Sequence, residues 1–137
     1  MIEVKNLSVQ TSKGVVLLDH VQFTLKPGIC TGLTGASGSG KTTLLKALMG
    51  VSDGDVSVHS GQILLDGEEL LKKPERIRRD LCGTILGFIP QNPMTAFNLQ
   101  VPVGTQMSET FRKRLRLDKN AACKLSMDVL QKVNLLD

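Results

Sequence analysis

One run of eight residues has the types and spacing needed to hold the phosphates of a nucleotide. It matches the pattern G-x-x-x-x-G-K-[ST] and consists of Gly35, Ala36, Ser37, Gly38, Ser39, Gly40, Lys41 and Thr42. Its glycines allow a tight turn and let backbone N–H groups approach the phosphates without a Cβ in the way. Lys41 can reach the β- and γ-phosphates, and the Thr42 hydroxyl is placed to bind Mg²⁺.

Two other interpretations of this run are weaker. An ordinary glycine-rich turn before a helix would not require the flanking elements described below. The dinucleotide-binding fingerprint has a different glycine spacing and an acidic residue about twenty positions further on. Lys41 and Thr42 directly after Gly40 therefore favour a nucleoside triphosphate.

The flanks of the loop are those of a strand–loop–helix unit. Residues 29–34 are mostly apolar or β-branched, which predicts a strand leading into the loop. Residues 41–49 carry Leu44, Leu45 and Leu48 on one side, and Gly50 follows where a helix C-cap glycine would lie. Strand, loop and helix thus come in the order that a phosphate-binding site requires.

Other segments before residue 100 read mainly as short strands. A helix with Pro near its start is predicted over 74–81, and turns at Pro27-Gly28 and Asp66-Gly67. Predicted strands cover 2–9, 15–18, 21–25, 55–59, 61–66 and 84–90. Because hairpin-like strands precede the loop, we expect an antiparallel β-layer beside an α/β core, unlike the layout of a small kinase.

The remaining residues read as two helices. The first has apolar side chains at four-residue spacing, and the second starts after Asp118, a candidate N-cap. The two apolar stripes comprise Val103, Met107, Phe111 and Leu115, then Ala122, Leu125, Val129, Val133 and Leu136. We interpret both as core-facing or subunit-facing surfaces.

Composition excludes several classes of function. The 137 residues suit one domain, the net charge is +4, and only four Phe and no Trp or Tyr are present, which argues against nucleic-acid stacking platforms. The basic runs 72–79 and 112–116 read as solvated helix faces, with contact to anionic lipid or a partner subunit as the alternative.

The three cysteines, Cys30, Cys82 and Cys123, lack a C-x-x-C pair and read as reduced, mostly buried thiols of a cytosolic protein. His20 and His59 show no ligand spacing, and no apolar run is long enough to span a membrane.

Two further segments point to a family. They are the opening Ile2-Glu3-Val4-Lys5-Asn6-Leu7-Ser8-Val9 and the segment Phe88-Ile89-Pro90-Gln91-Asn92-Pro93-Met94-Thr95-Ala96-Phe97-Asn98. Together with the phosphate loop they resemble the ATP-binding subunits of ABC transporters, and most closely the dipeptide, oligopeptide and nickel import group. The resemblance runs from residue 2 to about 136. Leu99 departs from it where that group usually has proline.

The resemblance implies a set of roles for these residues. Gln91 would be the Q-loop glutamine, serving Mg²⁺ or the attacking water, and Thr43 would add a hydroxyl near the α-phosphate. As the end of a predicted parallel strand, the position of Gln91 is also one where α/β sheets bind ligands. Family members place an aromatic residue near positions 12–16 to stack on adenine. This chain instead has Thr11, Ser12, Lys13, Gly14, Val15 and Val16 there, which implies loose base selectivity.

The resemblance also implies a complete working assembly. ATP with Mg²⁺ would drive closure of two such ATPase subunits, coupled to transmembrane permease subunits, at the cytoplasmic face of the inner membrane. The imported cargo would be peptides, nickel or a metal chelate. The whole chain, 1–137, would be the N-terminal portion of the domain, with β-layer and phosphate-loop core over 1–100 and the start of a helical subdomain over 101–137.

Three family motifs do not occur in these residues. They are the Leu-Ser-Gly-Gly-Gln-like signature, an apolar strand ending in Asp-Glu, and the switch histidine, which in the family serve γ-phosphate and the second Mg²⁺ tether. Since phosphoryl transfer depends on positioned charges, we expect the chain to be truncated and turnover by it alone to be doubtful. The alternatives are therefore a nucleotide-binding remnant that does not hydrolyse ATP and, less favoured, a small-molecule kinase.

Overall fold

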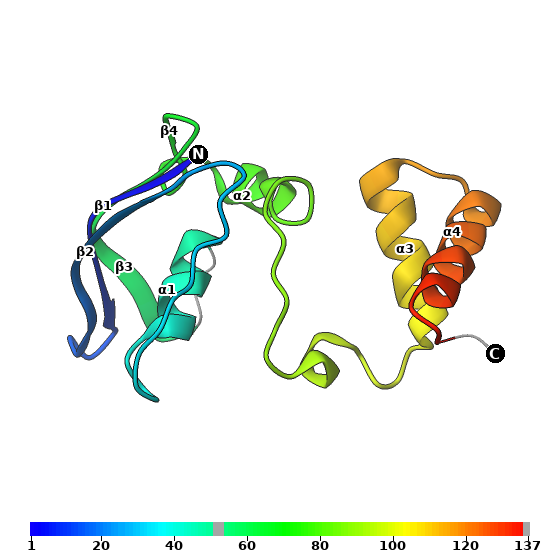
Figure 1. Ribbon diagram of the computed structural model, residues 1–137, viewed down its shortest axis with the longest axis horizontal. Coiled ribbons are helices and arrows are strands. Elements are labelled where there is room, and N and C mark those ends of the chain that lie inside the picture. Colours follow the sequence, from blue (N-terminus) through cyan, green and yellow to red (C-terminus); the bar gives the residue numbers. More distant parts are fainter. Residues whose placement is uncertain (51–53, 136–137) are drawn as a thin grey trace. The chain divides into compact units, whose positions relative to one another are not determined.

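The computed structural model describes residues 1–50 and 54–135 of the chain. It forms two compact units, Met1–Leu86 and Gly87–Asp137 (Figure 1). Among the described residues no helix is long and apolar enough to cross a membrane.

The first unit is built on an antiparallel sheet with the strand order β2-β1-β3-β4. Its strands are β1 (Ile2–Thr11), β2 (Val16–Leu25), β3 (Val56–Leu65) and β4 (Glu68–Glu69), and its helices are α1 (Lys41–Leu48) and α2 (Glu75–Leu81). The antiparallel β-layer predicted from the sequence is therefore confirmed. The predicted pairs of short strands, 15–18 with 21–25 and 55–59 with 61–66, are each one continuous strand.

A β-bulge explains why the second pair reads as two segments. Lys5 pairs with Gln62 and Ser8 with Ser60, so that two residues of β1 lie opposite Gly61 alone. Gly61 has a φ of 93°, and a Cβ added there would lie 2.3 Å from the carbonyl oxygen of Asn6. Glycine is therefore needed where β1 crosses close to this strand.

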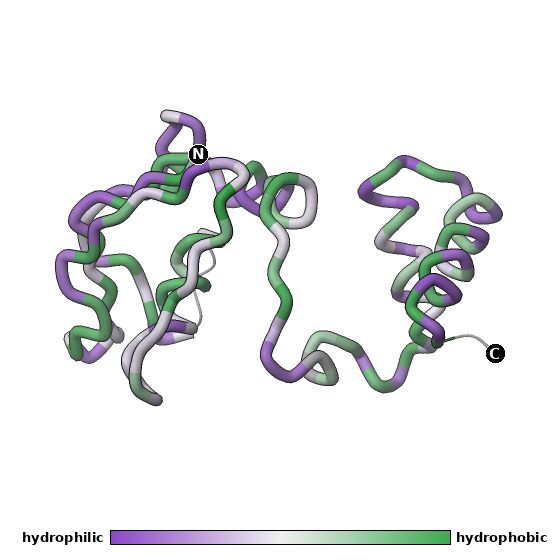
Figure 2. The backbone as a smooth tube through the Cα atoms, viewed as in Figure 1, coloured by the Kyte–Doolittle hydropathy of each residue, from purple (hydrophilic) through white to green (hydrophobic). Residues whose placement is uncertain are grey.

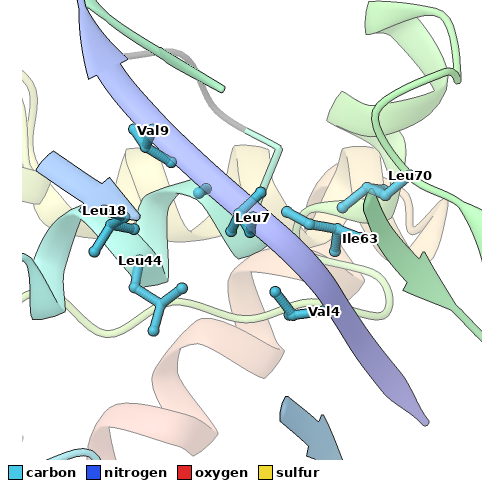
Figure 3. Packing of buried hydrophobic residues seen from close by; sticks show 8 residues of the cluster. Val4, Leu7, Val9, Leu18, Leu44, Ile63 and Leu70 are labelled. Atoms are coloured by element: carbon cyan, nitrogen blue, oxygen red, sulfur yellow. The ribbon is translucent and has the colours of Figure 1, made fainter. Parts of the chain in front are cut away.

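The core of this unit lies between the sheet and α1 (Figure 3). Leu7 is fully buried at the middle of β1, and Leu44 and Ala47 of α1 pack against the same cluster. Buried members from the strands and from the segment after β4 are Val4, Val9, Leu18, Ile63 and Leu70. This packing holds the start of α1, and with it the end of the phosphate loop, against the sheet.

Two predicted strands do not form. Residues 29–34 are irregular and exposed, with Ile29 at 65% and Leu33 at 47% exposure, and residues 84–90 make one isolated parallel bridge, between Cys82 and Leu86. A strand needs a neighbour for its backbone N–H and C=O groups, and the described residues provide no neighbouring strand to 29–34 and only the Cys82–Leu86 bridge to 84–90. The residues that the structure describes therefore form helices and an antiparallel sheet but no parallel sheet, and Gln91 does not follow a strand.

The second unit consists of helices and the segment that leads to them. It contains the 3₁₀ helix η1 (Pro93–Ala96), α3 (Val103–Leu115) and α4 (Lys119–Lys132). Hydrophobic and hydrophilic residues interchange along α3 and α4 (Figure 2). The predicted helices and the Asp118 cap are confirmed, since the Asp118 carboxylate accepts a hydrogen bond from the Ala121 N–H at 2.9 Å. Three residues of the predicted stripes are instead exposed: Val103 (46%) and Leu115 (55%) of the first and Val133 (57%) of the second. Leu136 lies outside the described residues.

The cysteines correct another expectation. All three are free thiols, but Cys30 and Cys123 are exposed and only Cys82 is half-buried, so they are not mostly buried. Cys30 is exposed because the segment around it is not part of a sheet. Cys82 lies closer to the core, with its thiol 3.3 Å from the Met49 carbonyl oxygen.

Candidate nucleotide-binding site

The phosphate-loop residues lead directly into α1, whose first backbone N–H groups have no partner inside the helix. Gly40 is the N-cap residue with a left-handed φ of 84°, and it offers no side chain to cap those groups. The first turn of α1 also contains no acidic residue. The helix therefore presents free N–H groups and the positive end of its dipole, which suits an anion.

The Lys41 ammonium group lies over the loop itself. Its Nζ donates to the carbonyl oxygens of Gly35 at 2.9 Å and Ala36 at 2.6 Å, and to the Ser39 hydroxyl at 3.4 Å. These bonds hold a positive charge at the loop and tie its two ends together. A phosphate oxygen placed within the loop would meet a positioned cation rather than a free, mobile side chain.

The last glycine of the loop, Gly40, packs closely against strand β2 of the sheet. A Cβ added at Gly40 would lie 2.7 Å from Leu18 Cδ2 and 3.1 Å from the Leu17 carbonyl oxygen. Gly38 has almost the same φ, 78°, but open space around the added Cβ. Gly40 is therefore required by conformation and by packing against β2, whereas Gly38 is required by conformation alone.

The two threonines at the start of α1 differ in exposure. Thr42 is exposed and Thr43 is half-buried, and both line a cavity of about 400 Å³ between α1 and β3. Lys46 and Arg78 line the same cavity, as does the ion pair of Lys72 with Glu69. The sequence did not reveal that these charged side chains share a cavity with the loop threonines, because only the packing of α1 and the following segments brings them together.

Gln91 belongs to the second unit. It is exposed, and the next residue, Asn92, caps η1 by accepting a hydrogen bond from the Met94 N–H at 3.1 Å. The structure brings together the loop residues of the first unit, from Gly35 to Thr43. The approach of Gln91 to that loop remains a prediction.

Sequence reasoning did not single out Gln106, whose side-chain amide bonds to the segment that follows η1. Gln106 lies in the first half of α3 and contacts Asn98 and Val101. Gln106 is polar and lies outside the predicted apolar stripe, and it belongs to no motif. A polar side chain near a helix start and close to a turn was the available signal.

One titratable group in the described residues is clearly shifted. Lys73 donates a hydrogen bond to the Glu68 carboxylate and lowers the pKa of that group below its ordinary value, with the attraction of the two charges as the second cause. Glu68 is exposed in the edge strand β4, and the half-buried Lys73 lies in the segment that follows it. No group of three or more His, Cys, Asp or Glu side chains suited to a metal occurs in the described parts of the chain.

Comparison with known proteins places these features in a family. Residues 18–136 match the family described as ABC transporter. The chain is 32% identical to the dipeptide transport ATP-binding protein DppD of Lactococcus lactis over 100% of its own length and 40% of that protein. It is 33% identical to the oligopeptide transport ATP-binding protein OppD of Haemophilus influenzae, covering 98% of the chain and 42% of that protein.

A third relative broadens the range of named cargo. The glutathione import ATP-binding protein GsiA of Pectobacterium atrosepticum is 36% identical over 89% of the chain and 21% of its own length. The chain thus spans less than half the length of the curated relatives it matches. Because the family match extends over most of the chain, the chain belongs to the ABC transporter family and carries part of its ATP-binding domain.

Proposed function

We propose that this chain binds ATP through the loop from Gly35 to Thr42, as the ATP-binding part of an ABC importer. The observation that carries the proposal is the uncapped start of α1 with Lys41 held over the loop. Free backbone donors, a helix N-terminus and a positioned ammonium group together supply what a polyphosphate requires. Family membership supports ATP as the ligand of that site.

The residues present also fit a Mg²⁺ ion that arrives with the nucleotide. The Thr42 hydroxyl is exposed on the first turn of α1, and Mg²⁺ is usually held by few protein oxygens together with phosphates and waters. When bound, the ion would neutralise charge that develops on the phosphates. Thr42 would hold it on this unit, Gln91 would add an amide oxygen, and Thr43 would contribute a hydroxyl near the α-phosphate.

The names of the relatives support the proposed cargo, and membership of the family supports the proposed partners. Proteins named for transport of dipeptides, oligopeptides and glutathione support a peptide-like cargo, and nickel or a metal chelate remains within the proposal from the sequence. We propose that a second ATPase subunit and membrane permease subunits complete the assembly, at the cytoplasmic face of the membrane. A second candidate function of these residues is nucleotide binding without turnover, which the phosphate loop and the start of α1 can support by themselves.

ATP affinity tests the proposal directly. Lys41→Ala removes the ammonium group over the loop, and the exposed Lys124→Ala in α4 is a control with the same change of charge. Losing one charge-assisted hydrogen bond costs about 1.5–3 kcal/mol, or roughly 10- to 100-fold in affinity. We expect that loss for Lys41→Ala and no change for Lys124→Ala, measured by calorimetric titration with Mg·ATP.

Two outcomes would count against parts of the proposal. Equal ATP affinity of the wild-type chain and Lys41→Ala would contradict binding through this loop. Phosphate release measured on the same samples separates the two candidate functions. Turnover that disappears in Lys41→Ala favours an active ATPase, whereas tight binding without turnover favours the nucleotide-binding remnant.

A further inference from the structure

The amide of Gln106 uses all of its main hydrogen-bonding directions on one short turn. Its Oε1 accepts from the Asn98 N–H at 3.0 Å, and its Nε2 donates to the carbonyl oxygens of Asn98 at 2.9 Å and Val101 at 2.7 Å. The side chain is half-buried, and its bond to the Val101 carbonyl is partly shielded from water, whereas the two bonds to Asn98 are exposed. Only a neutral amide of this length offers one acceptor and two donors together.

The turn that Gln106 holds is also closed by its own residues. The Asn98 side chain accepts a hydrogen bond from the Gln100 N–H at 3.0 Å, and the Val101 N–H donates to the Asn98 carbonyl at 3.1 Å. Pro102 is the N-cap of α3 and provides no side-chain cap. Gln106 therefore reaches back from inside α3 and fastens the preceding turn to the helix.

This turn is one end of the segment that carries Gln91. At the other end, Asn92 caps η1 directly after Gln91, and the chain passes through η1 and Phe97 to Asn98. Loosening the turn at Asn98 would free this segment to sample more positions, because each unfastened residue regains backbone freedom. We infer that Gln106 is a positioning residue for Gln91, acting through Asn98; the inference rests on the proposed function.

The test compares five forms of the whole chain. Gln106→Leu removes all three bonds with a residue of similar size and helix propensity, and Gln131→Leu makes the same change at an exposed position of α4. Gln91→Ala and the double variant Gln91→Ala/Gln106→Leu complete a cycle with the wild type. Two quantities are measured: hydrogen exchange at the Asn98 amide, and ATP affinity with and without Mg²⁺.

We expect Gln106→Leu to speed Asn98 exchange about tenfold or more, since that amide loses its acceptor. The gain in ATP affinity on adding Mg²⁺ should fall about threefold to tenfold, as for residues coupled in one network. If Gln106 acts through Gln91, its substitution cannot reduce the Mg²⁺-dependent gain in ATP affinity when the Gln91 side chain is already absent. In the Gln91→Ala background the same substitution should therefore change the Mg²⁺-dependent gain no further, and Gln131→Leu should match the wild type.

Each other result overturns a stated part of the reasoning. Unchanged Asn98 exchange refutes the fastening itself. Three results would refute the positioning role even if Asn98 exchange is faster. They are an unaltered Mg²⁺-dependent gain in ATP affinity, additive effects of the two substitutions in the double variant, and no effect of Gln91→Ala. Each of them leaves the proposed function standing. A wild-type chain that does not bind ATP overturns the proposed function, and this role with it.

Discussion

The two glycines Gly38 and Gly40 allow conformational strain to be separated from packing at the phosphate loop. Both have left-handed φ values, 78° and 84°, so replacing either with alanine imposes a similar backbone strain of about 1–2 kcal/mol. An added Cβ has open space at Gly38, but at Gly40 it meets the buried Leu18 side chain at 2.7 Å and the Leu17 carbonyl at 3.1 Å. Forcing an extra methyl group into such a contact costs about 1–3 kcal/mol more.

The free energy of unfolding of the two variants should therefore differ by that second amount. We expect Gly38→Ala to lose about 1–2 kcal/mol and Gly40→Ala about 2–5 kcal/mol. With a urea dependence of about 1–3 kcal/mol per molar, the unfolding midpoint of Gly40→Ala should be lower than that of Gly38→Ala by about 1 M. The measurement is urea unfolding followed by circular dichroism without nucleotide.

The comparison has a clear way to fail. Equal midpoints for the two variants would show that β2 does not press on the end of the loop, and the packing argument for the loop position would be refuted. A third variant, Gly40→Ala/Leu18→Ala, checks the cause. Removing the Leu18 branch relieves the contact at 2.7 Å, so the extra cost of Gly40→Ala should shrink in that background.

Two further substitutions test the architecture around the site. In urea unfolding, Gly61→Ala should destabilise the first unit by at least about 2 kcal/mol more than Gly67→Ala. The two glycines have similar φ, but an added Cβ lies 2.3 Å from the Asn6 carbonyl oxygen at Gly61 and meets nothing at Gly67. Equal losses would refute the close approach of the two strands at the bulge. Asp118→Ala should lower the free energy of unfolding by about 1 kcal/mol and reduce the helical signal in circular dichroism, because it removes the hydrogen bond from the Ala121 N–H. Asp118→Asn should retain most of the stability. Unchanged helicity in the alanine variant would argue against the cap.

Local signals in the sequence predicted local structure well. The helix after the phosphate loop, the turn at Asp66-Gly67 and the Asp118 cap depend on residues a few positions apart, and each forms as predicted. The strand over 29–34 failed because a strand depends on partners elsewhere in the chain, which apolar composition alone does not reveal. The bulge at Gly61 was missed for the same reason, since its cause lies at Asn6 on another strand.

At the candidate site, too, the features that the sequence predicts are local ones, and the others depend on tertiary packing. By itself, the sequence determined the phosphate loop, since eight contiguous residues specify its turns, its lysine and its helix start, and it also pointed to the family that the comparisons show. Tertiary structure alone decided that Gly40 packs on β2 and that Lys46 and Arg78 share a cavity with the loop threonines. These contacts join residues far apart in the chain, so their energies depend on packing that no short pattern encodes.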